Sequence, residues 1–303
     1  MSPPTERPGT RSALLQLLFA EVLIGSVGVF VHESGQDAVT AVFYRCLFGG
    51  LFLLGWAAAR GHLRGLLQDR TLLRGAVLSG VLLVLNWVAL FAGMARSSIG
   101  LATMVYHCFP FITLILAALV QGERTQPVDL AWTLLGFVGV VCTSDPAGIY
   151  RHADTAQLIG VGLALLAALL WSASLLISRQ VGKQRPLALV LIQCWVGVLM
   201  LGGFSNAGVF HWGLQWMWLI GLGVIHSGIV YVLFYSTYPR LPLVTIVVVA
   251  FVYPLVALLL DYWLYGHRLV PIQLAGVALI VLGTLGVNLK WRPRGLRSQM
   301  LRT

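Results

Sequence analysis

The sequence carries very little charge for its length. Of its 303 residues only 10% are Asp, Glu, Lys or Arg, while 58% are hydrophobic. Soluble domains usually carry about 25% charged residues. The mean hydropathy is +0.87. Because so few polar side chains cannot cover a soluble fold, the composition excludes an ordinary soluble domain and indicates an integral membrane protein.

Cysteine and recognisable catalytic motifs are also scarce. The four cysteines all lie inside apolar segments and none is close to another in a loop, so neither a disulfide framework nor a zinc site is expected. The sequence has no Walker loop, no His-Glu-x-x-His helix and no Gly-x-Ser-x-Gly elbow. No small-residue cleavage site follows the first apolar segment, which is too long for a secretory signal. We therefore expect no cofactor, no metal, no ATP hydrolysis and no enzymatic activity.

Acidic residues are outnumbered by basic ones, and the formal net charge is +10. In a soluble protein this excess would suggest nucleic-acid binding. Here the basic residues occupy short connections and the two tails, where they determine membrane orientation. We expect no nucleic-acid partner, and we expect the tail at 290–303 to meet anionic lipid headgroups.

Apolar segments near 20 residues long recur along the whole chain, and each can cross a bilayer as a helix. The short connections place consecutive helices antiparallel. The sequence predicts an all-α membrane protein with ten spans, at about 12–31, 38–59, 72–95, 97–120, 128–144, 158–177, 186–204, 212–238, 243–260 and 271–289.

The spans form an internal repeat. Pro110, Arg96 and Gly122 recur as Pro254, Arg240 and Gly266, always 144 residues later. Five spans per copy is an odd number, so the two copies enter the membrane with opposite orientation, as in many alternating-access transporters. The predicted organisation is an N-terminal tail (1–11), a first repeat (12–148), a second repeat (149–289) and a basic tail (290–303).

The basic residues predict which face lies in the cytoplasm. Sixteen of the 20 Lys and Arg residues fall on the side of the N-terminus, and only Arg96, Arg151 and Arg268 fall on the other, with Arg45 inside a span. Positive residues concentrate in cytoplasmic loops. Both termini are therefore expected in the cytoplasm.

The repeat motifs resemble the drug/metabolite transporter superfamily, and within it the EamA-type members with two repeats of five helices. The motifs that carry the resemblance are Phe109-Pro110, Gly122-Glu123-Arg124, Gly136 and Gly139, Leu23-Ile24-Gly25-Ser26 with its second copy Leu170-Trp171-Ser172-Ala173, and Arg45, whose second-half counterpart is Gln193. The second copy departs from the pattern at Gly266-His267-Arg268, where His replaces Glu. The resemblance covers nearly the whole chain and implies a plasma-membrane exporter of amino acids or related metabolites.

Six polar side chains fall near the middle of the membrane, where charges are costly unless they face protein or a water-filled cavity. They come from six different spans: Glu21, Arg45, Asn86, His107, Gln193 and His226. Glu21 and Arg45 are close enough in depth to form a permanent ion pair. Alternatively, Glu21 faces a cavity and binds a substrate ammonium group or a proton. The histidines could relay protons or be neutral core residues.

Aromatic residues accompany these polar groups. Trp87, Tyr106, Trp171 and Tyr231 could line a cavity for a flat or amphipathic solute, or could simply pack the helices. Pro110 and Pro254 break the hydrogen bonding of their helices, either as hinges beside the cavity or as static kinks.

The function predicted from the sequence is transport of a small organic metabolite by alternating access, with an aromatic amino acid exported across the plasma membrane, in bacteria the inner membrane. The candidate cavity residues are Glu21, Asn86, Trp87, Tyr106, His107, Trp171, His226 and Tyr231. Partners are the solute, the bilayer and, in one alternative, protons. The sequence leaves the oligomeric state open and is compatible with a monomer. An exporter of amines or drugs is the nearest alternative. An intramembrane enzyme, a channel or a receptor would be a different class.

Overall fold

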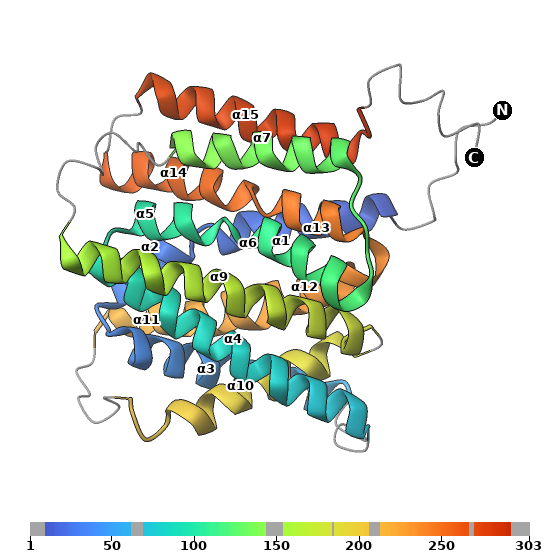
Figure 1. Ribbon diagram of the computed structural model, residues 1–303. Coiled ribbons are helices and arrows are strands. Elements are labelled where there is room, and N and C mark those ends of the chain that lie inside the picture. The colour runs from blue at the N-terminus through green and yellow to red at the C-terminus, as the bar shows by residue number, and fades with distance from the viewer. Residues whose placement is uncertain are drawn as a thin grey trace.

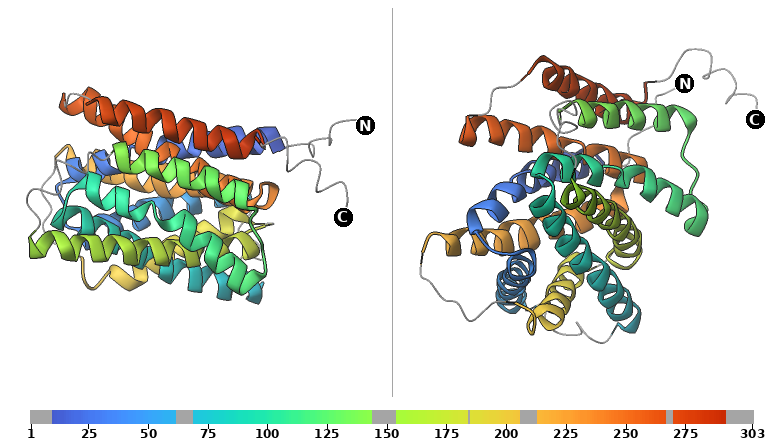
Figure 2. Two further views of the ribbon diagram at one scale, coloured as in Figure 1. Left: turned by 45° about the horizontal axis from the view of Figure 1, so that its top comes forward. Right: turned by 60° about the vertical axis from the view of Figure 1, so that its left-hand side comes forward.

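A computed structural model describes residues 10–61, 69–143, 154–183, 185–205, 213–266 and 270–291. These residues form helices and no strands (Figures 1 and 2). In chain order the helices are α1 (Thr10–Ile24), α2 (Val27–Ser34), α3 (Ala38–Ala59), α4 (Arg70–Arg96), α5 (Ile99–Tyr106), α6 (Phe109–Leu116), the π-helix η1 (Ala117–Gln121), α7 (Pro127–Thr143), α9 (Thr155–Val181), α10 (Pro186–Leu201), α11 (Gln215–Gly221), the π-helix η3 (Leu222–Ile229), α12 (Val230–Thr237), the 3₁₀-helix η4 (Tyr238–Arg240), α13 (Leu243–Val249), α14 (Val252–Tyr265) and α15 (Pro271–Asn288).

Short polar residues and prolines set where the helices begin. The Asp37 carboxylate accepts hydrogen bonds from the second and third amides of α3, and Asp69 does the same for α4. Asp154 accepts from Gln157 N at the start of α9. Such caps satisfy amides that have no partner within the helix. α7, α10 and α15 begin with proline, whose missing N–H is not needed at that position.

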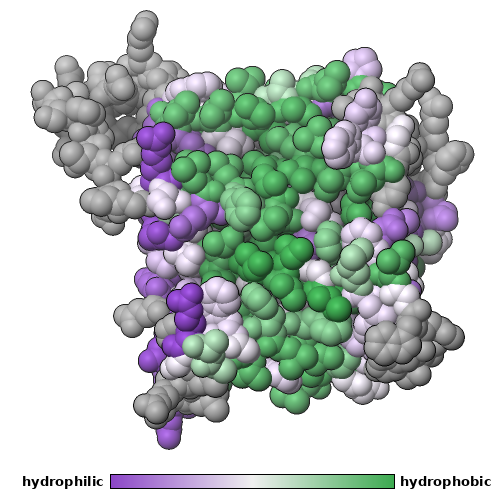
Figure 3. All heavy atoms as spheres, turned by 180° about the vertical axis from the view of Figure 1, so that it is seen from behind, coloured by the Kyte–Doolittle hydropathy of each residue, from purple (hydrophilic) through white to green (hydrophobic). Residues whose placement is uncertain are grey.

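Eight helical segments are long and apolar enough to cross a membrane. They are Thr10–Ser34, Ala38–Ala59, Arg70–Arg96, Ile99–Gln121, Thr155–Val181, Gln215–Arg240, Leu243–Leu264 and Pro271–Asn288. Two shorter apolar helices, Pro127–Thr143 and Pro186–Leu201, occupy the other expected span positions. The molecular surface shows a broad hydrophobic band, with hydrophilic side chains mostly along one edge and fewer at the opposite edge (Figure 3).

Three of the expected spans are interrupted rather than continuous. The first is interrupted between α1 and α2 at Gly25–Ser26, the fourth between α5 and α6 at His107–Cys108, and the ninth between α13 and α14 at Ala250–Phe251. In the last two, a proline follows the interruption. Proline has no N–H to donate to the preceding helical turn, and its ring clashes with a carbonyl group of that turn. The Gly25–Ser26 interruption was not expected from the sequence.

Equivalent helices of the two halves pack against each other. A Cβ added at Gly139 in α7 would lie 2.7 Å from the Gly276 carbonyl oxygen in α15, and one added at Gly283 would lie 2.7 Å from the Trp132 carbonyl oxygen. The repeat offset maps the first of these contacts onto the second. Trp132, near the start of α7, contacts Gly283 in the later part of α15, whereas Gly139, further along α7, contacts Gly276 in the earlier part of α15. The two helices therefore run antiparallel. They lie side by side in the ribbon views (Figures 1 and 2).

α3 and α10 meet in the same reciprocal way. A Cβ at Gly197 would overlap the Cys46 sulfur, and a Cβ at Gly49 would lie 3.4 Å from the Cys194 sulfur. These are again one contact and its counterpart, now under the alignment of Arg45-Cys46 with Gln193-Cys194. Gly122 and Gly266, the glycines of the two repeat motifs, both end a helix in the left-handed conformation, with φ of 69° and 68°. That conformation explains why the motif has glycine there.

Candidate functional site

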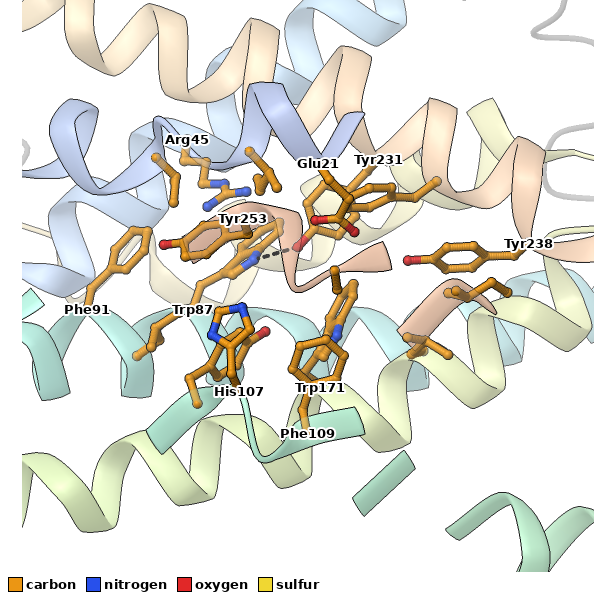
Figure 4. A pocket seen from close by; sticks show the side chains of 18 residues that line it. Glu21, Arg45, Trp87, Phe91, His107, Phe109, Trp171, Tyr231, Tyr238 and Tyr253 are labelled. Carbon is orange, nitrogen blue, oxygen red and sulfur yellow. Dashed lines mark hydrogen bonds between the residues drawn. The ribbon is translucent and has the colours of Figure 1, made fainter. Parts of the chain in front are cut away.

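A central cavity lies where the three interrupted helices meet the aromatic faces of α4, α9 and α12 (Figure 4). It encloses about 60 Å³, which is room for only a few water molecules. Residues from both halves line it, among them Glu21, Arg45, Trp87, Phe91, Tyr106, His107, Phe109, Trp171, Tyr231, Phe234, Tyr238 and Tyr253.

Glu21 lies on α1, four residues before the Gly25–Ser26 interruption. Its side chain is only 6% exposed, yet it makes no hydrogen bond or ion pair with the described part of the chain. Figure 4 shows its carboxylate among the rings of the cavity. A buried carboxylate without a protein partner is costly. It is therefore suited to hold a proton or to bind a cationic group that enters the cavity.

Arg45 projects from α3 and is almost completely buried, with 1% exposed. Its Nε donates to Ser227 Oγ at 2.8 Å, and its Nη2 donates to the His226 carbonyl at 3.2 Å. The guanidinium lies 4.0 Å from the centre of the Trp87 ring, a cation–π contact. The permanent ion pair with Glu21, one of the two alternatives raised by the sequence, does not form among the described residues. The protein holds Arg45 with neutral partners instead.

Trp87, Trp171 and Tyr231 form an aromatic wall of the cavity. At its centre is a contact between two residues at equivalent positions of the two repeats. Trp87 Nε1 donates to the Tyr231 hydroxyl at 2.9 Å, with the rings edge to face. These residues are separated by the repeat offset, so the contact lies where the two halves face each other. Trp171 also meets Tyr231 edge to face, at 5.8 Å between centroids. Edge-to-face pairs fix ring orientation, and this wall is therefore pre-formed.

His107 lies at the interruption between α5 and α6. Its Nδ1 donates to the Thr103 carbonyl at 2.7 Å. Its ring lies 5.2 Å from Tyr253 and 6.3 Å from Phe251, its repeat counterpart. The two interrupted helices therefore face each other at their break points, beside the cavity. Both predicted hinge prolines lie just beyond these breaks, Pro110 in α6 and Pro254 in α14.

Two of the predicted cavity residues do not line the cavity. Asn86 is not among the lining residues and donates from Nδ2 to the Ala167 carbonyl at 2.7 Å, which joins α4 to α9. His226 lies behind the wall, where its Nε2 meets Ser26 Oγ at 2.9 Å and its ring packs against Phe30. Gln193, the counterpart of Arg45, donates to Ser79 and Ser178 hydroxyls. In each case hydrogen bonding to a neighbouring helix fixes the side chain.

Other lining residues were missed by the sequence reasoning. Phe109 and Tyr253 are repeat counterparts, and each follows a helix interruption. Alignment of the copies around Pro110 and Pro254 could have paired them. Tyr238, from η4, closes one end of the cavity and stacks on Phe234 at 5.8 Å. No sequence pattern pointed to Tyr238.

Two larger cavities lie at the end of the molecule opposite the start of α1. One, of about 260 Å³, adjoins Thr103, Tyr253 and Gln273. The other, of about 210 Å³, adjoins Asp37 and Phe91. Tyr253 and Phe91 also line the central cavity. These two side chains therefore separate the central cavity from larger spaces at one end.

Comparison with known proteins decides the family. The sequence matches the EamA-like transporter family over residues 11–145 and 158–289. The chain belongs to the EamA-like transporter family. It is 30% identical to an uncharacterized transporter of Bacillus subtilis, over 90% of this chain and 88% of that protein. It is 27% identical to an uncharacterized transporter of Archaeoglobus fulgidus, over 91% of this chain and 95% of that protein.

Two further comparisons bear on fold and on substrate. A riboflavin transporter of Rhizobium johnstonii is 33% identical over 57% of this chain and 55% of its own length. A protein of known crystal structure superposes with a TM-score of 0.77 at 20% identity, covering 92% of this chain and 97% of its own. This EamA-like transporter is therefore a multi-pass integral membrane protein that moves a small-molecule substrate. Its central cavity is the candidate substrate site.

Proposed function

We propose that the protein is a secondary transporter with ten spans arranged as two inverted repeats, and that it works by alternating access. The reciprocal contacts of α7 with α15 and of α3 with α10 support this arrangement, because equivalent helices that cross antiparallel are what inverted repeats produce. The interrupted helices at His107 and Phe251 support a site at the interface between repeats, where discontinuous helices line transporter sites.

The face that carries the N-terminus is proposed to be cytoplasmic. Below, the term basic face denotes the end of the molecule that holds Arg70, Arg124, Arg179, Arg240 and Lys290. Basic residues concentrate on the cytoplasmic side of membrane proteins. The two larger cavities then adjoin the outer face, and the described conformation is closest to outward-facing. Export of the solute, the direction expected from the family resemblance, would follow its loading from the basic face.

The proposed substrate is an amino acid with an aromatic side chain. The observation that carries this proposal is that Glu21 and Arg45, of opposite charge, line one cavity without pairing with each other. An α-ammonium group at Glu21 and an α-carboxylate at Arg45 would satisfy both charges. The rings of Trp87, Trp171 and Tyr231 would enclose an aromatic side chain. Because the cavity is smaller than the roughly 300–1,000 Å³ of typical ligand sites, binding requires it to widen.

A flat, uncharged aromatic solute is the second candidate. The riboflavin transporter that resembles part of this chain favours it, as does the predominance of rings among the lining residues. Such a solute would leave Glu21 free to carry a proton. An exporter of amines or drugs would use Glu21 and the rings, with no role for Arg45.

Counterflow in proteoliposomes tests the proposal. The purified protein is reconstituted with an unlabelled solute inside, and uptake of labelled aromatic amino acids, aliphatic amino acids, amines or riboflavin is followed, with and without a pH gradient. Saturable counterflow of aromatic amino acids is expected. Counterflow of riboflavin or amines alone would overturn the amino-acid proposal. No exchange of any solute by folded protein would overturn the proposed carrier mechanism itself.

A further inference from the structure

The Gly-Glu-Arg motif at the end of the fourth span has no role in the cavity, but it contributes an ion pair elsewhere. Glu123 Oε1 lies 2.6 Å from Arg179 Nη1. Glu123 follows η1 in the first half of the chain, and Arg179 lies near the end of α9 in the second half. The pair therefore joins the two halves at the basic face.

A second polar contact joins the halves at the same face. Arg240 Nη2 donates to Gln16 Oε1 at 2.8 Å, while its Nε donates to the Ser236 carbonyl within its own segment. Arg96, the repeat counterpart of Arg240, makes the corresponding bond to its own Ala92 carbonyl. Its guanidinium makes no further hydrogen bond with a described residue. Polar contacts join the halves at both ends, since Gln273 Nε2 donates to the Thr143 carbonyl at 3.1 Å at the end where Arg96 lies. The basic face adds the Glu123–Arg179 ion pair.

The sequence prevents the same ion pair from forming at the other face. The repeat offset aligns Glu123 with His267, which lies outside the described residues, and the alignment of Leu23 with Leu170 matches Arg179 to His32. In an inverted repeat, closure of the opposite face would bring these counterparts together. Two histidines cannot form the ion pair that Glu123 and Arg179 form. The interactions that stabilise the closed form of each face are therefore different at the two faces.

We propose that Glu123 and Arg179 form a latch that keeps the transporter closed at the basic face when no solute is bound. The inference rests on the proposed alternating-access function. The cavity can open to the basic face, where an exported solute would load, only when this pair breaks. The pair is partly exposed, at 18% for the Arg179 and 43% for the Glu123 side chain, so its effect on the equilibrium between states is about two- to fivefold.

Accessibility of the central cavity from the basic face tests the latch. Leu175 lines the cavity on α9 and is buried. The variant Leu175→Cys is placed in inside-out vesicles and labelled with a membrane-impermeant maleimide in the absence of solute. Labelling of the same protein without this substitution gives the background from the native cysteines. The probe reports which face is open, whether or not the protein transports a tested solute.

Glu123→Gln and Arg179→Gln, each added to Leu175→Cys, are expected to raise the labelling rate about two- to fivefold. The charge swap Glu123→Arg with Arg179→Glu is expected to restore the slow rate. Arg124→Gln, which removes a neighbouring charge outside the pair, is the matched control and should not change it. Unchanged labelling in both single variants, or failure of the swap to restore it, would overturn the latch. Loss of counterflow activity for every solute would not, because labelling is measured without transport.

Discussion

At the residue scale, the protein treats its two buried charges differently. Arg45 has hydrogen bonds to Ser227 and His226 and a stacking contact with Trp87, so its charge is supported by the fold. Glu21 has no such support among the described residues. A group that the fold does not use is available to a ligand, and the carboxylate of Glu21 is therefore the strongest functional candidate of the cavity.

Glu21→Gln is expected to leave folding intact and to slow counterflow strongly. The substitution preserves shape and removes a buried charge that has no partner, so the free energy of unfolding should not fall. Transport should drop at least about tenfold, because the loss of a charged hydrogen bond to the solute costs about 1.5–3 kcal/mol. Thermal unfolding and counterflow of the purified variant measure the two effects. Transport at the original rate would show that Glu21 is structural.

Arg45→Gln reproduces the residue that the second half uses at the matching position, Gln193. Because Gln193 bonds to two serine hydroxyls, one on α4 of the first half and one on α9 of its own half, a glutamine at position 45 should reach Ser227 and retain the fold. Affinity for a carboxylate-bearing solute should fall about tenfold or more. Binding measured for an amino acid and for the corresponding amine separates the roles. Equal losses for both solutes would contradict a carboxylate contact.

The sequence could predict which polar and aromatic residues lie at membrane depth, but not which way their side chains point. Polar and aromatic residues at membrane depth gave Glu21, Trp87, Tyr106, His107, Trp171 and Tyr231, all of which line the cavity. Asn86 directly precedes Trp87 and yet faces α9. Adjacent residues on a helix point about 100° apart, and the sequence alone does not say which of two polar neighbours faces the interior cavity.

At the element scale, close contact between equivalent helices organises the bundle. The internal repeat predicted which helices correspond, and Gly136, Gly139, Gly276 and Gly283 supplied the small surfaces. It could not predict the interruption at Gly25–Ser26, because no proline marks it. There the Ser26 hydroxyl donates to the Leu23 carbonyl and forms a hydrogen bond with His226 Nε2 on η3. The interruption of the first span therefore coincides with a contact between helices that are distant in the sequence.

Gly139→Ala is expected to destabilise the protein by about 1–3 kcal/mol. The added Cβ would lie 2.7 Å from a backbone oxygen and 2.8 Å from a backbone nitrogen of α15, so the helices would have to separate. Gly162→Ala is the matched control: it also lies within a helix, and its Cβ would meet nothing within 4 Å. Thermal unfolding in one detergent compares the two. Equal midpoints would contradict tight α7–α15 packing.

Pro110→Ala and Pro254→Ala are expected to slow transport if the two interruptions act as hinges. Alanine supplies the N–H that proline lacks, which favours a continuous helix and opposes bending there. Turnover in counterflow should fall in both variants, while solute affinity changes less. Unchanged turnover in both would show that the prolines only shape static kinks.

At the scale of the whole molecule, the proposed alternating access requires two states. The reciprocal contacts between the halves would make these states similar in structure, and the Glu123–Arg179 pair at the basic face would make them different in stability. A solute can shift such an equilibrium only by binding one state better than the other. In the proposed mechanism the cavity of about 60 Å³ widens to accept a solute. Glu21 and Arg45, which do not pair with each other, then favour a solute that carries both charges.

The most direct test of this account compares three solutes that differ only at their charged groups: tryptophan, its amine tryptamine and the carboxylate indole-3-propionate. Counterflow of each is measured with the wild-type protein in liposomes at one concentration. Tryptophan is expected to exchange at least about tenfold faster than either analogue, since each analogue lacks one charged contact. Exchange of tryptamine as fast as tryptophan would contradict the paired roles of Glu21 and Arg45.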